Sequence, residues 1–468
     1  MSEALLIKGG CVVTMDAARR RFDPGAVLVE GSRIAAVGPS QELAAAYPGV
    51  ASIEAAGALV TPGLIDAHNH PIHYLSKGLA DDLELSVRSY RNIWPFEAGL
   101  TPEEAHLSSL GTFAEMIRGG TTCFVDPGSP RPHEVARAAA EIGIRGVVSR
   151  EAWDLPDENA PAGLLEQTDA VLAAGEEVVE RWNGAADGRL RAWLSLVRPS
   201  SVSDELCRRT KRRADELGVG IHGHLVASRT EDRDTQRVVG SGSAVPRYAE
   251  LGLLGPNLCL AHLGWLEDAE IELLLEAGVK GVHCPSASML GGFGVIAHGR
   301  FPELVEAGVP VALGSDAAAI SRFLDMVRVG YLAACGHKDA RIDPTVMGAD
   351  CAFEMLTSGG ARCVLWEDEI GSLEAGKAAD LVVWDTDGLE WHPNPLANPI
   401  RNLIYSASGR SARTVLIDGN VVMRDRVIAN LDLDPFLAAA DAAAAAVRAR
   451  LGLEVGAEGG RAAGATAG

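Results

Sequence analysis

The stretch Leu64-Ile-Asp-Ala-His-Asn-His-Pro71 carries two histidines directly after a short apolar run. Such a run is typical of a buried strand of a parallel sheet. Residues i and i+2 of a strand point the same way, so we expect the imidazoles of His68 and His70 to project together. Their spacing suits two nitrogen ligands of one metal ion. Taken alone, the stretch is equally compatible with a chance His-x-His at the end of a strand.

The same pattern, an apolar run that ends in His or Asp, recurs further along the chain. The later runs end at His224, His262, His283 and Asp316. A buried core histidine is the ordinary interpretation of any one of them. A series of such ends favours a shared site over unrelated core residues. The ends of parallel barrel strands converge on one face, and catalytic groups are carried on that face.

Amphipathic stretches separate these runs, among them Pro102–Ile117, Pro132–Ile142 and Ser203–Leu217. An alternation of strands and helices predicts a parallel sheet. Residues 61–370 hold about eight such units, the number that a TIM-like (β/α)8 barrel needs. A doubly wound open sheet is the structural alternative, which periodicity does not exclude.

Both chain ends differ from residues 61–370 in their predicted secondary structure. Residues 1–60 read as short strands with turns at Gly9-Gly10, Pro24-Gly25 and Gly31-Ser32, and residues 371–430 add further strands around the hairpin turn Asp418-Gly419-Asn420. Each group is too small for a good core alone, so we expect one composite β-sandwich built from both ends. Residues 431–468 then form an Ala-rich helix over Asp434–Leu451 and a frayed tail.

Composition and missing motifs exclude several classes of partner and reaction. The chain has 468 residues, 47% of them hydrophobic and 22% charged, and a net charge of −21. That charge disfavours nucleic acid and anionic membranes as partners. Eight scattered cysteines without a Cys-x-x-Cys pair, and a start without an apolar leader, predict a cytoplasmic protein. No P-loop, Gly-x-Ser-x-Gly or His-Glu-x-x-His motif occurs, so a phosphate-binding loop, a serine hydrolase and a His-Glu-x-x-His metalloprotease have little support. The expected partner is a small-molecule substrate.

The strand ends themselves suggest a metal site. His222 and His224 lie on one strand, and we assign His224 as the ligand because it is nearer the carboxyl end, with His222 one layer below; the two could exchange roles. Three imidazoles and a carboxylate make a mononuclear site for one divalent ion per chain, with Zn²⁺ favoured over Fe²⁺, Mn²⁺ and Co²⁺. His262 and His283 would then handle protons.

Several motifs resemble the metal-dependent amidohydrolase superfamily, in the branch of triazine hydrolases, guanine deaminases and adenosylhomocysteine deaminases. They are, in order, Pro62–His70, Trp94–Glu104, Gly120–Thr122, Ala261-His262, His283–Ser286, Gly314–Asp316 and Gly371–Asp385. The resemblance spans roughly residues 4–430. It implies a homo-oligomer, most simply a dimer.

Position by position, the resemblance implies the metal ligands His68, His70, His224 and Asp316. It implies that Asp316 also takes a proton from the metal-bound water, that His262 orients the attacked group or approaches the metal, and that His283 contacts the substrate.

One departure from the branch bears on the reaction. Its deaminases carry Glu three residues after the metal-binding His of the fifth strand, where this chain has Ala227. Glu231 or Asp232 could substitute from the following loop, and Glu151 and Asp154 could bind substrate. At the fourth strand Arg198 stands in place of Lys, so a two-metal site bridged by a carboxylated lysine has no candidate.

Three functions therefore compete. The first is hydrolysis of an amide-, urea- or carbamate-like C–N bond, not a peptide bond, in a small cyclic or aryl-bearing molecule by attack of metal-bound hydroxide. The second is a deaminase or chlorohydrolase of an aminated heterocycle (guanine, adenosine-type or triazine). The third is an inactive metal-binding scaffold, which the retention of all the expected ligands argues against.

Overall fold

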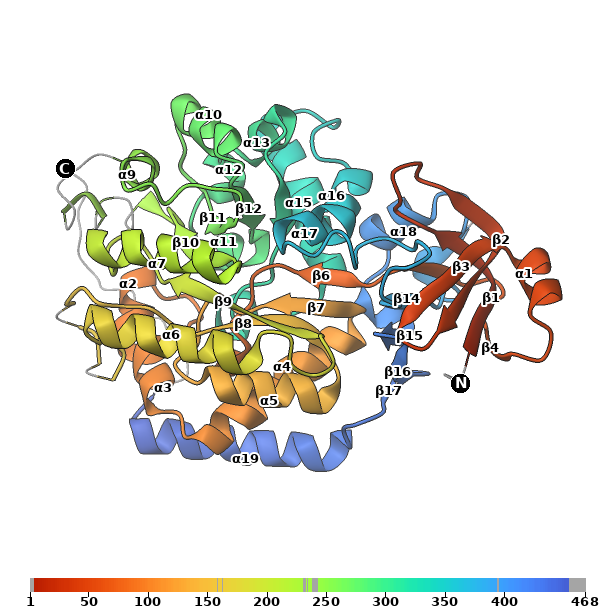
Figure 1. Ribbon diagram of the computed structural model, residues 1–468, viewed down its shortest axis with the longest axis horizontal. Coiled ribbons are helices and arrows are strands. Elements are labelled where there is room, and N and C mark those ends of the chain that lie inside the picture. Colours follow the sequence, from red (N-terminus) through yellow and green to blue (C-terminus); the bar gives the residue numbers. More distant parts are fainter. Residues whose placement is uncertain are drawn as a thin grey trace.

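The computed structural model describes residues 4–157, 159–161, 163–229, 233, 235–237, 243–393 and 395–453. Two bodies of secondary structure lie side by side (Figure 1). One is a barrel of parallel strands surrounded by helices, and the other is a sheet built from both chain ends.

The barrel consists of eight parallel strands in the order β13-β12-β11-β10-β9-β8-β7-β6. They are β6 (Leu64–Asp66), β7 (Thr121–Val125), β8 (Arg145–Ser149), β9 (Leu190–Leu196), β10 (Ile221–Leu225), β11 (Leu258–His262), β12 (Lys280–His283) and β13 (Val311–Leu313). The amide N of Ala67, just after β6, donates to the carbonyl O of Leu313, 3.0 Å away, and so links the first strand to the last. The predicted barrel is confirmed, and the open-sheet alternative is wrong.

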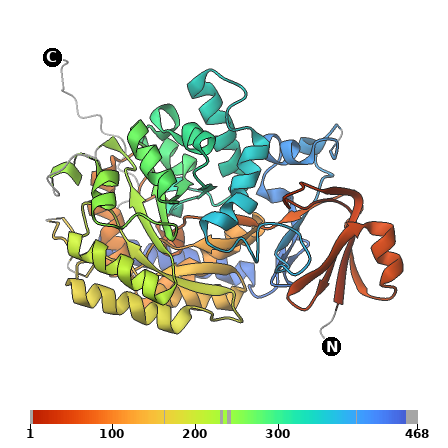
Figure 2. The same cartoon turned by 45° about the horizontal axis from the view of Figure 1, so that its top comes forward.

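Helices cover the barrel from outside (Figure 2). The main ones are α4 (Pro102–Arg118), α5 (Pro132–Ile142), α6 (Thr168–Trp182), α7 (Asp204–Leu217), α10 (Asp268–Glu276), α13 (Phe301–Ala307) and α15 (Met326–Arg341). Local sequence sets their ends: Thr101 and Glu104 form a capping box at the start of α4, and Gly143 ends α5 at φ 91°. Thr101 thus starts α4, and Gly143 stops α5 just before β8 begins at Arg145.

The second body is a nine-stranded sheet in the order β17-β16-β15-β14-β5-β1-β2-β3, with β4 paired to β1. Its strands are β1 (Ala4–Val13), β2 (Arg21–Glu30), β3 (Arg33–Pro39), β4 (Ala51–Glu54), β5 (Leu59–Pro62), β14 (Leu381–Trp384), β15 (Ala412–Ile417), β16 (Asn420–Arg424) and β17 (Val427–Ile428). Because β5 pairs antiparallel with β14, the two chain ends share one sheet. The composite β-domain is confirmed.

Two details of this sheet were wrongly predicted. The Pro24-Gly25 pair does not turn the chain but lies inside the continuous strand β2, where Gly25 pairs with Gly10 of β1. The Gly9-Gly10 pair does not turn the chain but lies inside the continuous strand β1. The register of β1 against β2 shifts between Lys8, Gly10 and Val12, and Gly9 has φ 87°. A glycine with positive φ allows a bulge that keeps the strand running, so the apolar residues on both sides remain in one strand.

The Ala-rich segment near the carboxyl end forms α19 (Leu433–Leu451), as predicted, and contacts α3 (Trp94–Gly99) and α4. Figure 1 shows it running along the barrel, from near β17 toward the side away from the sheet. Residues 454–468, where a frayed tail is predicted, lie outside the described residues. Across the described part of the chain, no helix has both the length and the apolar character needed to cross a membrane.

Candidate active site

The carboxyl ends of the barrel strands bring the expected metal ligands together. Nε2 of His70 lies 3.2 Å from Nε2 of His224, and Oδ1 of Asp316 lies 3.7 Å from Nε2 of His70 and 3.9 Å from Nε2 of His68. Nε2 of His262 is 4.0 Å from Oδ2 of Asp316. Residues separated by up to about 250 positions in the chain thus face a single point, as the strand ends predicted.

Hydrogen bonds fix the orientation of these side chains. Nδ1 of His224 donates to the carbonyl O of Val197, 2.6 Å away. The proton is therefore on Nδ1, and the lone pair of Nε2 is free to face the site. The backbone amide of Asp316 donates to the carbonyl O of His68 over 2.8 Å, and Oδ1 of Asp316 accepts from the amide of Ala317 over 2.6 Å. The ligand set is therefore held in place by the backbone around it.

The backbone at two of these strand ends is strained. His262 has φ 79° and Asp316 has φ 64°, in the left-handed region that side chains other than glycine rarely adopt. Strain of this kind is kept where surrounding structure over-determines it, which is common at active sites. Here it turns both side chains toward the shared point.

The chemistry of this donor set fits a divalent cation. Burial, reinforced by the neighbouring imidazoles, lowers the pKa values of His68, His70 and His224 well below their ordinary range, so all three rings are neutral at pH 7. Nε2 of His68 is buried and has no hydrogen-bond partner among the described residues. Neutral imidazoles with a free lone pair, beside a carboxylate, are the ligands that such ions require.

His222 lies one layer below the site, as expected. Its Nε2 is 3.1 Å from the carbonyl O of Ala67 and 3.5 Å from Nδ1 of His68. Burial lowers its pKa to about 4, so the ring is neutral and the nitrogen facing the carbonyl carries the proton. His222 therefore supports the backbone next to His68 from beneath.

The structure does not bring His283 to the pocket wall. The side chain is fully buried, its ring lies 4.1 Å from that of Phe301, and its Nε2 is 3.1 Å from Nε2 of His337. Asp154 also points elsewhere, accepting hydrogen bonds from Ser203 and Thr168 at the start of their helices. Glu231 and Asp232 lie outside the described residues.

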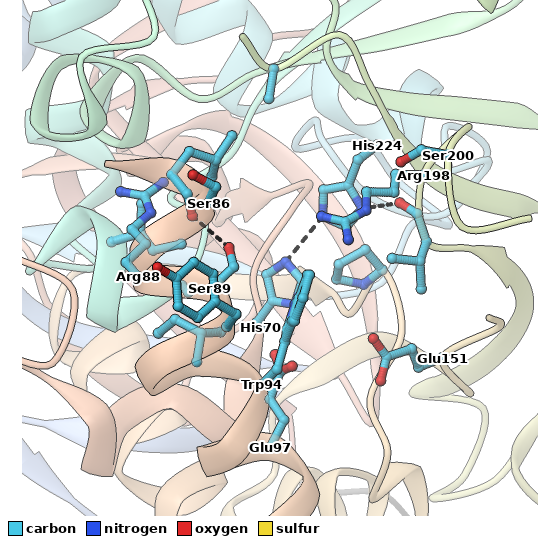
Figure 3. Close-up of a pocket in the computed structure, with 18 of the residues that line it drawn as sticks. His70, Ser86, Arg88, Ser89, Trp94, Glu97, Glu151, Arg198, Ser200 and His224 are labelled. Atoms are coloured by element: carbon cyan, nitrogen blue, oxygen red, sulfur yellow. Dashed lines mark hydrogen bonds between the residues drawn. The ribbon is translucent and has the colours of Figure 1, made fainter. Parts of the chain in front are cut away.

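A cavity of about 690 Å³ opens above the histidines (Figure 3). Its wall includes residues that sequence analysis singled out, namely His70, His224, Ala227, His262, Asp316, Glu151, Arg198 and Trp94. Burial raises the pKa of Glu151 well above its ordinary range, and the nearby Glu97 adds to the effect. The guanidinium of Arg198 lies over the rings of Trp94 and Trp153, at 4.8 and 5.4 Å from their centres.

Other wall residues were missed. His73 and Glu97 are joined by a 2.9 Å hydrogen bond, and Arg88 sits at the end of the short helix α2 (Leu85–Arg88). A His-x-x-His spacing from His70 to His73 was the one available signal for His73. Nothing in the sequence distinguishes Arg88 from a solvated arginine on an amphipathic helix.

Comparison with known proteins places the chain in a family. The pattern that defines the Amidohydrolase family matches residues 59–422, and that of the bacterial imidazolonepropionase-like composite domain matches residues 25–49. The chain belongs to the amidohydrolase family. It is accordingly an enzyme that hydrolyses carbon–nitrogen bonds other than peptide bonds.

Individual relatives are similar over nearly their whole length. A 5-methylthioadenosine/S-adenosylhomocysteine deaminase of Syntrophobacter fumaroxidans is 37% identical over 432 residues, covering 92% of this chain and 95% of the relative. A 5'-deoxyadenosine deaminase of Methanothermobacter thermautotrophicus is 36% identical and covers 95% and 99%. The crystal structure of an adenosine deaminase from Xanthomonas campestris with bound zinc superposes with a TM-score of 0.89 at 30% identity, over 95% of this chain and 98% of that one.

Proposed function

We propose that this chain hydrolyses an acyl carbon–nitrogen bond, as in an amide, urea or carbamate, at a single metal ion held by His68, His70, His224 and Asp316. The observation that carries the proposal is the convergence of these four side chains beside a cavity that is lined by His70, His224 and Asp316 and whose wall also holds Ala227. The ligand set supports metal-dependent hydrolysis, and the alanine bears on which bond is cleaved.

A divalent ion in this site would polarise the attacked group and lower the pKa of water toward about 7. Asp316 is placed to accept the proton of the attacking water at its carboxylate and to pass it to the leaving nitrogen. His262, with Nε2 at 4.0 Å from Asp316, would donate to the oxygen on which negative charge develops. His283 touches His337 and has no part in these steps, so its expected contact with substrate stays a prediction.

The preference for an acyl bond follows from what Ala227 lacks. Removing an amine from an aromatic ring requires a proton on the ring nitrogen as water adds, and general acid catalysis of this kind contributes about 10²–10⁴-fold. Ala227 has no proton to give. Hydrolysis of an acyl bond does not require a proton on a ring nitrogen, since only the carbonyl oxygen and the leaving nitrogen change charge.

A second candidate is deamination of an aminated heterocycle. It is favoured by the similarity to adenosine-type deaminases and by Glu151, whose carboxyl group is buried on the pocket wall with Oε2 unpartnered among the described residues. A protonated carboxyl group there would supply from another strand the proton that Ala227 does not supply.

Two panels of compounds separate the candidates. Metal-replete enzyme is assayed for amine release from aryl amides, ureas and carbamates, and for ammonia release from adenosine, 5'-methylthioadenosine and guanine. We expect turnover in the first panel. Ammonia release alone would overturn the acyl preference, and a loss of about 10²-fold or more in Glu151→Gln would then identify Glu151 as the acid.

Zinc as the native metal is part of the proposal, supported by the donor set and by the zinc in the related deaminase structure. Assembly as a homodimer, the absence of nucleic-acid and membrane partners, a cytoplasmic location and the domain limits at residues 60, 370 and 430 stay predictions.

A further inference from the structure

Arg88 is a buried cation for which the described residues offer no ion-pair partner within 4.0 Å. Its side chain is 1% exposed, and its Nε and Nη2 atoms have no hydrogen-bond partner within the described structure. The guanidinium lies over the ring of Phe293, 5.0 Å from its centre. A guanidinium keeps its charge in proteins, so this group is a positive charge held out of water.

Other buried arginines of the chain are paired. Arg145 makes two hydrogen bonds with Asp380, of 2.7 and 3.1 Å, and Arg247 donates to Asp204 over 2.9 Å and to the carbonyl O of Pro199 over 3.1 Å. An unpaired buried charge is strongly unfavourable, whereas a paired one is tolerated. Arg88 is therefore the exception that needs an explanation.

The position of Arg88 supplies one. It lines the same cavity as His70, His224 and Asp316, and in Figure 3 it lies on the opposite side of His70 from Arg198, behind Ser89. Asp316 influences it electrostatically, but no ion pair within 4.0 Å joins them, and Asp316 is committed to the metal site. A Cβ added to Gly291 would lie 3.1 Å from Nη1, so the backbone there leaves room for the guanidinium.

We propose that Arg88 is the anion-binding residue of this pocket and that the substrate carries a carboxylate, which the guanidinium of Arg88 binds while the scissile bond lies over the metal ligands. A guanidinium pairs with a carboxylate through two parallel hydrogen bonds. One arginine matches one negative charge. The inference rests on the proposed function, since it names the substrate class of that site.

Binding rather than turnover tests the proposal. Benzoate, 3-phenylpropionate and acetate, and the carboxamide of each, are titrated calorimetrically into metal-replete wild-type protein, Arg88→Met and Arg88→Lys. Arg401→Met is the control, because Arg401 is exposed and pairs with Asp350 on the surface. Thermal unfolding of each variant is measured in the absence of ligand, and phenylphosphonate serves as a second kind of anion.

We expect at least one carboxylate to bind wild-type protein about tenfold or more tightly than its amide, a preference that Arg88→Met abolishes, Arg88→Lys reduces and Arg401→Met retains. We also expect Arg88→Met to unfold at the same temperature as wild type or higher, since it removes an unpaired buried charge.

Equal binding of every acid and its amide to wild type would overturn the proposal. An unchanged preference in Arg88→Met would do the same, and a lower unfolding temperature in that variant together with unchanged binding would assign Arg88 to packing on Phe293. Tighter binding of phenylphosphonate than of any carboxylate would replace the carboxylate by a phosphoryl group. Intact acid selectivity without turnover of either substrate panel would refute the proposed function alone.

Discussion

The two roles proposed for Asp316, binding the metal and accepting a proton, can be separated by replacing one oxygen of its carboxylate. Its carboxylate is placed both to bind the metal and to accept a proton, while an amide retains an oxygen ligand but accepts no proton. We therefore expect Asp316→Asn to lose about 10²-fold or more in kcat while keeping at least part of its metal, as measured by steady-state assay and elemental analysis. Activity within tenfold of wild type would show that the base lies elsewhere, with His262 the next candidate.

Individual site residues differ in how far the sequence could predict them. His68 and His70 were predictable because the two-residue period of a strand places both imidazoles on one side. His283 follows the same rule and ends its strand, yet its ring turns to His337 and Phe301 inside the protein. Arg88 was not predictable, because its burial depends on how α2 lies over the barrel and not on its own neighbours in the chain.

At the level of elements, one ion network joins the barrel to the composite sheet. Arg145 begins β8, and it pairs with Asp380, which precedes β14, and with Asp418 at 2.9 Å. Truncating one partner of a buried pair typically costs about 3–5 kcal/mol, so we expect Arg145→Met to lower the free energy of unfolding by that amount in denaturant titrations. Because Arg145 is at the amino end of its strand, opposite the pocket, kcat of the folded fraction should be unchanged.

A charge-free replacement of the pair is the control for this prediction. Asp380→Leu combined with Arg145→Met removes the fully buried pair and leaves only Asp418, which is partly exposed, so it should recover part of the loss. A single variant as stable as wild type would mean that the network contributes nothing to docking. The sequence shows Arg145 and Asp380 as ordinary charged residues 235 positions apart, and only the pairing of β5 with β14 brings their elements together.

For the whole molecule, the arrangement of both chain ends was predictable because neither set of strands could form a core alone. The register within the sheet was not, since Gly9 and Gly10 are as suited to a bulge as to a turn. A closed barrel was predictable because the sequence holds about eight strand–helix units. The hydrogen bond that completes it, from Ala67 to Leu313, depends on the twist of all eight strands.

The number of metal ions per molecule is the last prediction. A second group of donors, His70, His73 and Glu97, lies beside the first. However, Nε2 of His73 is engaged with Glu97 at 2.9 Å and its Nδ1 with Ser76 at 2.9 Å, so the group offers no free imidazole lone pair beyond that of His70, which the first site uses. Arg198, in turn, cannot form the carboxylated bridge that a lysine would provide.

We therefore expect elemental analysis to find one ion per chain, and His68→Ala or His224→Ala to lose both metal and activity. His73→Gln is the matched control, since it removes an imidazole from the second group alone and should keep the ion. An ion that binds only the folded chain stabilises it, so chelation should lower the unfolding temperature of wild type and His73→Gln but not of His68→Ala. Two ions per active chain, one of them lost in His73→Gln, would contradict the mononuclear site.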